Sequence, residues 1–422
     1  MTHESSFKLA IIYRKFYELT GHLLMTKKLY YENLYSREFD ANIIDIQGNN
    51  IILDETLFYP SGGGQPCDIG FIDDIAVVDV HEKNGEIIHV LSEPIHEYKQ
   101  IHGVIDWEKR FELMQQHLGE HIFAGELYNL HGLHTARMRI EGDNVSIDVD
   151  TPVDEKIILE AESLANEAIY KDIPVEIIYP EMSEIKELAR KLPPEHNSEP
   201  VRIVKIEGVD YVPCCGLHVS TTGQVGLIKI TSHENHKGGT RIYLKSGRAA
   251  YRWVDSVYRE VRRAESELVC GYMGINEKIL NLKSQIDSLK LQNENNILRY
   301  LRPLAENLIN TAKNFGDFKL VKHVIKDSTQ DEIKHLFKLL TESDKNLVVL
   351  LACENENNDG AFIMFGCNRE NKNIDVRPAF KSAIKKLNGK GGGSAFSCQG
   401  FSEKTDLLNQ VLDSAVNELV NK

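Results

Sequence analysis

Two stretches in the first quarter of the chain alternate apolar and polar residues with a period of two, which predicts β-strands. The first is ANIIDIQGNNIILDETLFYP, residues 41–60, which folds back around a Gly-Asn-Asn turn. The second is FIDDIAVVDVHEKNGEIIHVL, residues 71–91, and its Asn84-Gly85 pair is a signal for a type I′ hairpin. We therefore expect residues 27–107 to be rich in β-strands.

From Asp106 the apolar positions recur with helical spacing. In WEKRFELMQQHLGEHIFAGELYNL they fall at 107, 111, 114, 118 and 122, which predicts an amphipathic helix. DEKIILEAESLANEAIYKD predicts a second one. Strand patterns surround the second helix, in RMRIEGDNVSIDVD, VRIVKIEGVDYVPCCGLHV and VGLIKITSHENHKGGTRIYLKSG. This part of the chain is therefore predicted to combine helices with an antiparallel sheet.

The remainder of the chain divides into a helical stretch and a small α/β domain. Residues 249–309 favour a hairpin of two helices around Gly271 and Gly274. In the second helix, apolar residues step by four and three, a heptad pattern, at Ile275, Ile279, Leu282, Ile286 and Leu289. This short seam fits an arm packed on itself or on a partner. Residues 310–422 follow the order strand, helix, strand, strand, helix, glycine run, helix, which predicts a separate domain.

The composition is that of an ordinary globular protein, with 42% hydrophobic and 27% charged residues among 422. The net charge of −14 argues against diffuse electrostatic binding to nucleic acid and leaves room only for a local basic surface. The seven cysteines are irregularly spaced and do not indicate a disulfide framework. No run of 18 apolar residues predicts a membrane span, so we expect a cytoplasmic protein.

Two pairs of residues suggest a metal site. His117 and His121 are four apart on the predicted helix, a spacing that places both imidazoles on one face. Cys214 and His218 repeat the spacing within a turn, PCCGLHV. Imidazole and thiolate together favour Zn²⁺. The alternatives are a partly buried helix histidine at 117, a small core cysteine at 214, and a closed zinc site that only joins two segments.

The glycine run SGGGQPCDIG connects two strand-rich stretches. The backbone N–H groups of Gly62, Gly63 and Gly64 would allow a close approach of substrate, because glycine has no Cβ. Gln65 is a candidate substrate-binding residue whose side chain would hydrogen-bond the adenosine or the amino acid. The alternative is a plain tight turn between barrel strands. No Lys-Ser/Thr pair and no helix follow, so the run is not a phosphate-binding P-loop.

Two runs of basic residues stand out against the acidic background, and neither contains an acidic residue. They are candidate phosphate contacts for an RNA recognised by its shape and backbone. The alternative for either is a solvated surface of ordinary charge. The first run contains Lys237, Arg241, Lys245, Arg248 and Arg252, and the second contains Arg377, Lys381, Lys385, Lys386 and Lys390.

Four segments, FYPSGGGQP with CDIG, QQHLGEH, CCGLHV and KGGTRIYLKSGRA, resemble in order and spacing the signatures of the alanyl-tRNA editing family. These proteins are free-standing relatives of the alanyl-tRNA synthetase editing domain, and the likeness is to the long AlaX type. It runs from about Met25 to Ala250. The helical stretch and NGKGGGSAFSCQG resemble the C-terminal domain that these long forms share with the synthetase.

The resemblance implies a zinc-dependent, ATP-independent hydrolase of the ester that joins a wrong amino acid, chiefly serine, to tRNA-Ala. It implies His117, His121, Cys214 and His218 as zinc ligands, with the two helix histidines at the catalytic centre. Cys215 stands at a glycine position of the family pattern and is not expected to be a ligand.

Two departures from the family pattern bear on specificity. Glu120 and Leu217 each precede a histidine at a position where the family usually has threonine. The first threonine is credited with sensing the substrate hydroxyl, so deacylation is more firmly implied than the preference for serine. Glu120 is a candidate catalytic base or a contact for the substrate amino group, and the alternative is a solvated helix carboxylate.

The expected fold is an α+β multidomain protein in five parts. These are an N-terminal extension (1–24), which is an appended helix or an over-extended start; a Gly-loop β-barrel (25–105); a zinc-containing α/β editing core with an antiparallel sheet (106–248); a helical arm (249–309); and a small Gly-rich α/β C-terminal domain (310–422). Mischarged tRNA-Ala is the expected partner. The resemblance also implies a homodimer through the arm and the C-terminal domain.

The sequence leaves one alternative function open and disfavours two others. A non-catalytic, zinc-stabilised RNA-binding protein needs only a closed zinc site and the basic runs. A phosphoesterase is disfavoured because the chain has no Asp-His-His triplet and no clustered carboxylates. A tRNA ligase is disfavoured because about 24 residues before the barrel are too few for an aminoacylation domain.

Overall fold

The computed structural model describes residues 25–192, 200–326, 328–354, 360–371 and 374–421. The chain forms two compact units, of which the first ends at Ala264 and the second begins at Glu265. Each unit combines helices and sheets, which confirms the mixed α/β multidomain class. The expectation for residues 1–24 lies outside the described residues.

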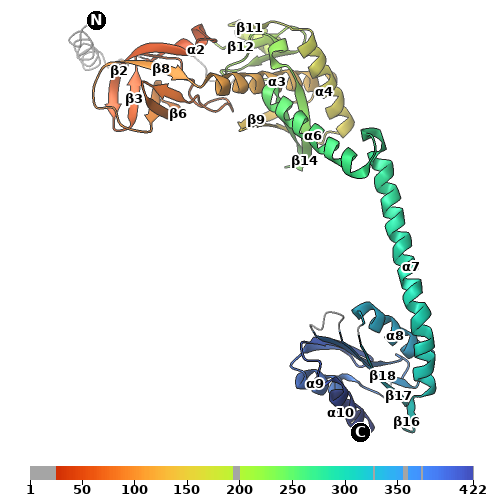
Figure 1. Cartoon of the computed structure of the whole chain (residues 1–422). Coiled ribbons are helices and arrows are strands. Elements are labelled where there is room, and N and C mark those ends of the chain that lie inside the picture. Colours follow the sequence, from red (N-terminus) through yellow and green to blue (C-terminus); the bar gives the residue numbers. More distant parts are fainter. Residues whose placement is uncertain (1–24, 193–199, 327, 355–359, 372–373, 422) are drawn as a thin grey trace. The chain divides into compact units, whose positions relative to one another are not determined.

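The first unit begins with a closed six-stranded barrel (Figure 1). Its strands, in spatial order, are β2 (Glu38–Gln47), β3 (Asn50–Leu53), β7 (Glu86–Leu91), β6 (Ile75–Lys83), β5 (Gly70–Ile72) and β8 (Gln100–Ile105). Asn84 and Gly85 join β6 to β7 with φ values of 54° and 85°, the left-handed pair that a type I′ turn requires. The predicted hairpin is thereby confirmed. β1 (Lys27–Lys28), α2 (Leu29–Glu32) and β4 (Glu55–Thr56) lie beside the barrel.

The long helix α3 (Trp107–His131) leads from the barrel into the rest of the first unit (Figure 1). Asp106 caps its start by accepting a hydrogen bond from the Lys109 backbone, and Gly132 ends it in the left-handed conformation. The helix packs against α4 (Glu155–Tyr170) on one side and against strands of two sheets on others. Because it is covered so completely, even its polar side chains between 110 and 121 are buried.

Two antiparallel sheets surround α3. One has the strand order β14 (Ile228–His236), β15 (Gly239–Ser246), β10 (Asn144–Val149), β9 (Thr135–Glu141). The other has the order β11 (Val175–Ile178), β12 (Ile203–Ile206), β13 (Asp210–Pro213). The 3₁₀ turn η1 (Thr222–Val225) and α5 (Met182–Leu188) complete this part. All the strand patterns predicted after α3 are present in the sequence order expected.

A buried ion pair joins the barrel to α3. The Arg110 side chain, in the first turn of α3, and the Asp68 side chain, after the glycine run, are 0% and 1% exposed. Arg110 Nε donates to Asp68 Oδ1 at 2.8 Å, and the Tyr59 backbone N–H donates to Asp68 Oδ2 at 2.6 Å. The pair therefore ties the end of the glycine-containing loop to the helix that carries His117.

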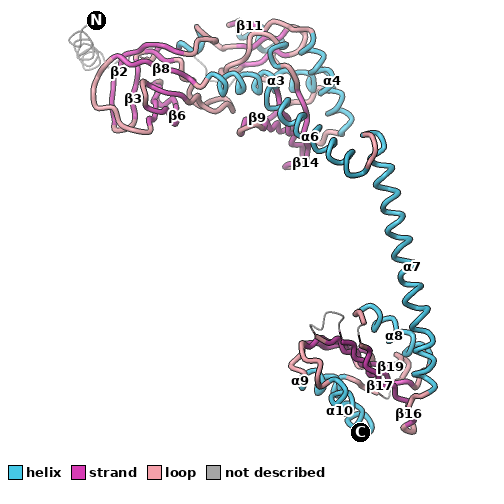
Figure 2. Tube along the Cα trace, in the orientation of Figure 1, coloured by secondary structure: helices cyan, strands magenta, loops and turns pink. Residues whose placement is uncertain are grey.

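The second unit contains α7 (Ile275–Asn310) and a six-stranded sheet (Figure 2). The sheet order is β16 (Lys313–Asn314), β17 (Lys319–Ile325), β18 (Leu347–Glu354), β19 (Ala361–Cys367), β21 (Ser397–Ser402), β20 (Lys390–Ser394). One face packs on α9 (Arg377–Lys386) and α10 (Leu408–Val420). The other face packs on α8 (Gln330–Ser343) and the end of α7. The predicted order of elements in this domain is confirmed.

The glycine run of the second unit forms the edge strand β20. A Cβ at Gly391 or Gly393 would lie 2.4 or 2.1 Å from a backbone oxygen of the neighbouring strand β21, so side chains at these two positions would separate the strands. Gly392 has open space around it. Close packing of the two strands therefore explains why glycine is required at two of the three positions.

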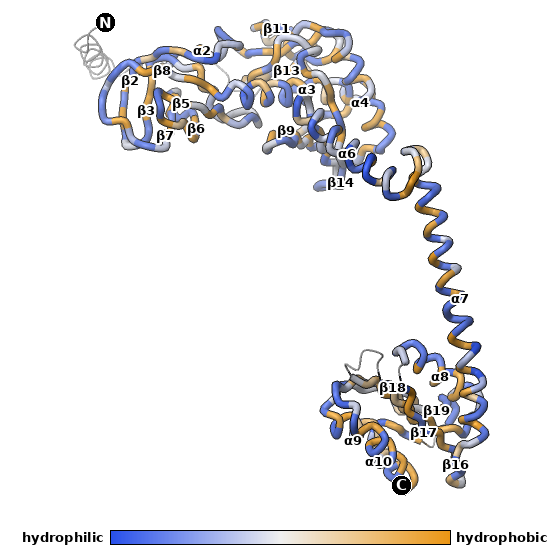
Figure 3. The backbone as a smooth tube through the Cα atoms, in the orientation of Figure 1, coloured by the Kyte–Doolittle hydropathy of each residue, from blue (hydrophilic) through white to orange (hydrophobic). Residues whose placement is uncertain are grey.

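Along α7, polar and apolar positions alternate, as Figure 3 shows. The heptad residues Ile279, Leu282, Ile286 and Leu289 have exposed side chains. Among the described residues, no helix is long and apolar enough to cross a membrane. The helix α6 (Gly247–Leu268) and the turn η2 (Tyr272–Gly274) precede α7 in the chain.

Candidate metal centre

Two helix residues and two loop residues meet in the first unit. α3 supplies His117 and His121, and the loop after β13 supplies Cys214 and His218. The metal-binding atoms of these four side chains all lie within 4.8 Å of one another. The three histidines are buried, at 1–3% exposed, and Cys214 is half-buried. The structure thus brings together the four residues that the two sequence pairs singled out.

The separations of the donor atoms fit a tetrahedral ion. Cys214 Sγ lies 3.4 Å from His117 Nε2 and 3.6 Å from His218 Nε2. Around zinc, bonds of about 2.3 Å to sulfur and 2.0–2.1 Å to nitrogen at a tetrahedral angle place the two donors about 3.5 Å apart. One thiolate with three imidazoles is also a donor set that suits zinc. The residues present therefore fit the expected metal.

Gln65 fixes the ring of His117. Its Oε1 lies 2.8 Å from His117 Nδ1 and also accepts the Leu217 backbone N–H at 3.0 Å. Because a backbone N–H can only donate, the oxygen of the amide must face both groups, and His117 Nδ1 must carry the proton. This leaves Nε2 of His117 with a lone pair directed toward Cys214. The Gln65 side chain is 2% exposed, so it acts on the histidine from inside the protein.

Asp210, at the start of β13, does the same for His121. His121 Nδ1 lies 2.9 Å from Asp210 Oδ2. Arg190 holds this carboxylate in turn, with Nε at 2.8 Å from Oδ1, and donates from Nη1 to Thr135 Oγ1 at 2.8 Å. A carboxylate behind a histidine is a common arrangement at metal sites, because it sets the tautomer and strengthens the ligand. Neither Asp210 nor Arg190 was predicted from the sequence.

The surroundings of Cys214 favour its thiolate form. Burial alone would raise the pKa of this thiol, but the imidazoles of His117, His218 and His121 outweigh it and hold the pKa well below its usual value. The Gly216 backbone N–H also lies 3.3 Å from the sulfur and donates to it. A thiolate at neutral pH is the form that binds a metal. Cys215, by contrast, is an exposed residue as a whole, and the partial burial of its sulfur raises the pKa of the thiol.

Gly216 allows the ligand loop to pass against His117. A Cβ at this position would lie 2.0 Å from His117 Cε1 and 2.4 Å from Nδ1, so the ring would have to move. We predict that Gly216→Ala weakens zinc binding about 10- to 100-fold, the usual cost of losing the support of a ligand. Competition with a chromophoric chelator measures the affinity. Gly271→Ala is the control, since nothing lies within 4 Å of its Cβ position. Equal affinities for the two variants would contradict the packing argument.

Glu120 is buried rather than solvated. It lies on α3 between the two histidines and is 5% exposed, so the interpretation as a solvated helix carboxylate is wrong. Among the described residues it makes no hydrogen bond and no ion pair. The charges of the nearby His121 and Arg190 offset that of the carboxylate, although neither side chain donates a hydrogen bond to it. This makes Glu120 available to a ligand at the metal centre.

The glycine turn lies beside the edge strand β9. Gly62 and Gln65 exchange backbone hydrogen bonds of 3.0 and 2.9 Å around Gly63 and Gly64, whose φ values are 59° and 86°. The run is thus a two-residue turn that requires left-handed backbone, and the Gly64 carbonyl accepts the Ile140 N–H of β9 at 3.0 Å. All three glycines are exposed. This geometry does not test the predicted contact of the three glycines with substrate, which stays a prediction.

Most of the first basic run is neutralised by acidic residues from other segments. Arg241 binds Asp148 through Nε at 2.6 Å and Nη2 at 2.9 Å, because the two residues face each other across β15 and β10. Arg248 pairs with Glu108. Lys245 donates to the Asn144 side chain at 2.8 Å. Lys237, at the turn between β14 and β15, has no ion-pair partner among the described residues.

The second basic run keeps more of its charge. Within the described residues, Lys385 and Lys390 have no carboxylate partner, and Lys386 donates only to Ser414 Oγ at 2.5 Å. Arg377 pairs with Asp375. These lysines lie on α9 and at the start of the edge strand β20. This run therefore remains the stronger candidate for a phosphate contact.

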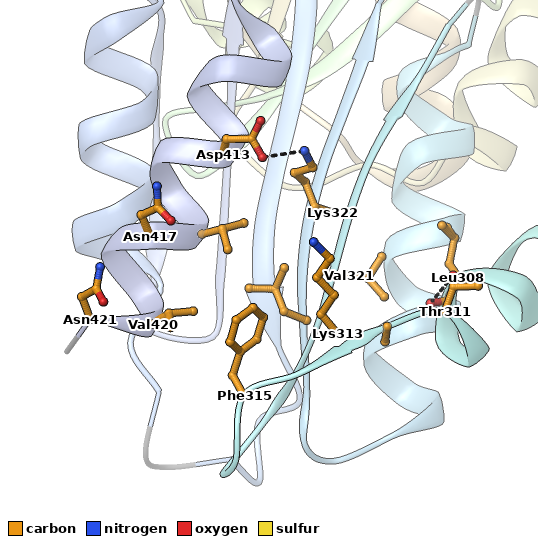
Figure 4. Close-up of a pocket in the computed structure, with 13 residues that line it drawn as sticks. Leu308, Thr311, Lys313, Phe315, Val321, Lys322, Asp413, Asn417, Val420 and Asn421 are labelled. Carbon is orange, nitrogen blue, oxygen red and sulfur yellow. Dashed lines mark hydrogen bonds and ion pairs between the residues drawn. The ribbon is translucent and has the colours of Figure 1, made fainter.

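The second unit also has a hollow of about 460 Å³ between the end of α7, β17 and α10 (Figure 4). Lys322 Nζ donates to Asp413 Oδ1 at 2.6 Å across it. Phe315, Val321 and Val420 contribute apolar walls. Its lining contains no histidine and no cysteine, so the hollow lacks the chemistry of the metal centre.

Family models match three parts of the chain. Residues 201–243, which include Cys214 and His218, match the threonyl and alanyl tRNA synthetase second additional domain. Residues 11–109 match the class II (A) tRNA synthetases, and residues 317–422 match the DHHA1 domain. The second additional domain thus contains one half of the histidine–cysteine cluster.

Curated relatives match over nearly the whole length. Alanyl-tRNA editing protein AlaX-L of Pyrococcus horikoshii is 31% identical over 414 residues, which cover 94% of this chain and 98% of the relative. Alanyl-tRNA editing protein Aarsd1 of Mus musculus is 27% identical, over 88% of this chain and 92% of the relative. An alanine–tRNA ligase of Ignicoccus hospitalis is 27% identical over 92% of this chain but only 43% of the ligase. The chain therefore belongs to the family of alanyl-tRNA editing proteins.

Proposed function

We propose that this protein hydrolyses the ester between a wrong amino acid and tRNA-Ala, with serine as the main amino acid removed. It is an aminoacyl-tRNA deacylase by family. The observation that carries the proposal is the buried cluster of three imidazoles and one thiolate within the chain's match to these proteins. We further propose that the reaction needs no ATP, because an aminoacyl ester is already activated.

Zinc is the metal we propose, held by His117, His121, Cys214 and His218. When bound, it would polarise the ester carbonyl or lower the pKa of a water molecule. Gln65 and Asp210 keep the rings of His117 and His121 oriented, and Gly216 keeps the loop close. The protein's remaining task is to place water and to stabilise the charge that develops on the ester oxygen.

Glu120 is the residue that we assign as general base, or as the contact for the substrate amino group. Two features support either role: its buried position on α3, and the absence of a hydrogen bond to its carboxylate from any described residue. We predict that Glu120→Gln lowers kcat about 100-fold, within the range that a general base contributes, with little change in bound zinc. Single-turnover hydrolysis measures the rate, and elemental analysis measures the zinc. Glu126→Gln, a half-buried carboxylate on the same helix, is the control. If Glu120→Gln hydrolyses the ester as fast as the control variant, Glu120 has no role in the reaction.

For tRNA binding we propose the second basic run first. Lys385, Lys386 and Lys390 present charges that no carboxylate of the described chain offsets. In the first run, Lys237 presents a free charge, whereas Arg241, Lys245 and Arg248 are engaged within the protein. We therefore expect these three to shape the surface rather than to bind phosphate strongly. The exposed turn of Gly62, Gly63 and Gly64 would admit the acceptor end beside Gln65.

The function is tested by single-turnover hydrolysis of tRNA-Ala charged with serine, glycine or alanine. The wild-type protein should release serine fastest, and removal of zinc by a chelator should stop release. Release of glycine instead would keep the reaction and change the specificity. If none of the three amino acids is released although the tRNA still binds, the proposed activity is refuted.

A second candidate is a non-catalytic, zinc-stabilised RNA-binding protein. One observation favours it: four protein donors fill a tetrahedral ion, as in structural sites, whereas catalytic sites usually keep one position open. This candidate predicts that zinc removal unfolds the first unit and that no hydrolysis occurs with zinc present. Circular dichroism with and without chelator, beside the hydrolysis assay, separates the two.

The exposed heptad residues of α7 support a further part of the proposal, a homodimer through the arm and the C-terminal domain. Ile at positions 279 and 286 with Leu at 282 and 289 is a pattern of two-stranded coiled coils. Sedimentation of the whole chain tests it. We propose the cytoplasm, where tRNA is charged, as the place of action.

A further inference from the structure

Two side chains from distant segments hold the loop that carries the metal ligand Cys214. Tyr31, on α2, donates from its hydroxyl to the Cys215 carbonyl at 2.6 Å. Arg202, the residue before β12, donates from Nη1 to the Cys214 carbonyl at 2.5 Å. Both groups therefore lie directly beside the metal centre, on the side where the loop becomes exposed.

Tyr31 and Arg202 also stack on each other. The Arg202 Cζ atom lies 5.0 Å from the centre of the Tyr31 ring, which is the geometry of a cation–π pair. Tyr31 is 38% exposed, and Arg202 is half-buried. Among the described residues, Arg202 has no hydrogen-bond acceptor besides the Cys214 carbonyl. Most of its five N–H donors are therefore available to a ligand.

The stacked pair adjoins the exposed glycine turn. The Tyr59 hydroxyl lies 3.4 Å from both the Cys215 carbonyl and the Gly62 carbonyl, so it links the ligand loop to the turn. Nearby, Lys28 and Glu82 neutralise each other through bonds of 3.1 Å. An aromatic ring, a guanidinium with most of its donors unengaged among the described residues, and an exposed turn thus meet at the rim of the metal centre.

We propose that Tyr31 and Arg202 form the subsite for the 3′-terminal nucleoside of the aminoacyl-tRNA. The proposal rests on the function proposed above, in which the metal centre acts on an ester of the 3′-terminal ribose. The base and the ester belong to the same nucleotide, so the base must lie close to the metal centre when the ester is in place. Aromatic rings and guanidinium planes are the usual stacking surfaces for unpaired bases. The free N–H groups of Arg202 suit ribose or phosphate oxygens.

The competing explanation is that the pair serves only to hold the ligand loop. Tyr31→Phe removes the bond to Cys215 and keeps the ring, whereas Tyr31→Ala removes both. A subsite predicts that only the second variant loses affinity for the nucleoside. A purely structural role predicts that both variants lose bound zinc and that neither changes base recognition.

The probe is the RNA tetranucleotide ACCA with a 5′ dye and with serine joined to its 3′ end by a stable amide. Binding to the full-length zinc protein is measured by fluorescence anisotropy, and zinc content is measured for each variant. Tyr31→Ala should weaken binding about 10- to 100-fold, the scale of one stacked base, and should retain its zinc. Tyr31→Phe should stay within about threefold of wild type, because it loses a single hydrogen bond.

A second probe is first compared with ACCA on the wild-type protein alone, so misfolding of a variant cannot obscure that comparison. An otherwise identical RNA with an abasic terminal ribose should bind the wild-type protein about 10- to 100-fold more weakly than ACCA, since the stacked base is missing. This difference should disappear in Tyr31→Ala. Equal binding of the two probes by wild type, or an equal penalty in wild type and Tyr31→Ala, would overturn the proposal.

The outcomes separate the subsite from the proposed reaction. Release of serine from Ser-tRNA-Ala together with equal binding of the two probes would retain the reaction and refute the subsite. No release of serine from any charged tRNA, together with base-dependent binding that Tyr31→Ala abolishes, would refute the reaction and retain a nucleoside site.

Discussion

If the proposed function holds, replacement of Cys214 by serine is expected to lower kcat/KM for Ser-tRNA-Ala by about 1,000-fold or more. The variant would lose the proposed zinc ion, whose charge would offset the negative charge that develops on the ester oxygen. The Cys214 sulfur lies 3.4 Å from His117 Nε2 and 3.6 Å from His218 Nε2, at the centre of the cluster. The three imidazoles hold the pKa of the thiol low, so it is a ready ligand. A serine hydroxyl does not ionise in this way, so the variant would offer zinc three neutral imidazoles without the thiolate and would bind it less tightly.

The adjacent cysteine provides a matched control for this variant. Cys215 is exposed and lies outside the group of four donors, so Cys215→Ser should retain both zinc and activity. Zinc content is measured by atomic emission, and the rate by single-turnover release of serine. Full activity in Cys214→Ser would show that the cluster is not the catalytic centre. Loss of both zinc and helical signal, with no activity in the wild type, would favour the structural zinc site.

The histidine–cysteine cluster could be predicted because its residues form two local pairs that coincide with motifs of the alanyl-tRNA editing family. A spacing of four on a helix places His117 and His121 on one face, and the same spacing in the turn places Cys214 beside His218. The residues that orient them could not be predicted. Gln65 is 52 residues from His117, and Asp210 is 89 residues from His121. No local pattern signals such contacts, because they exist only after the barrel, α3 and β13 have packed together.

The sequence predicted helices and strands better than it predicted which charged side chains stay exposed and unpaired. The reason is the same: the partners come from distant segments. The run that contains Arg241 has no acidic residue of its own, yet Asp148 faces Arg241 from the neighbouring strand. Opposite charges that face each other on neighbouring strands form ion pairs. An arginine in such a pair has less free positive charge to attract a ligand. Glu120 shows the reverse case. Its sequence neighbours suggest an ordinary helix surface, but α3 is covered on nearly every side, and the carboxylate is buried.

The Asp68–Arg110 pair is expected to be the most sensitive point for stability. Asp68→Asn should lower the free energy of unfolding of the first unit by about 3–5 kcal/mol, because it leaves the Arg110 charge buried without a counter-ion. Both side chains are at most 1% exposed, so water cannot take over the lost interaction. Urea unfolding followed by tryptophan fluorescence measures the change. Both tryptophans, Trp107 and Trp253, belong to the first unit, so their emission reports on it alone.

The exposed pair of Arg139 and Glu141 supplies the control, since Glu141→Gln should change the same free energy by less than about 1 kcal/mol. The double variant Asp68→Asn/Arg110→Met should regain most of the lost stability, because it removes the unpaired charge and keeps an apolar side chain of similar length. Asp68 also accepts the Tyr59 N–H, and Tyr59 contacts the glycine turn and the ligand loop. The amide oxygen of an asparagine can accept the same N–H, so the double variant should regain activity together with stability. Full stability in Asp68→Asn alone would show that the barrel and α3 are held together by apolar packing, and that the ion pair contributes little.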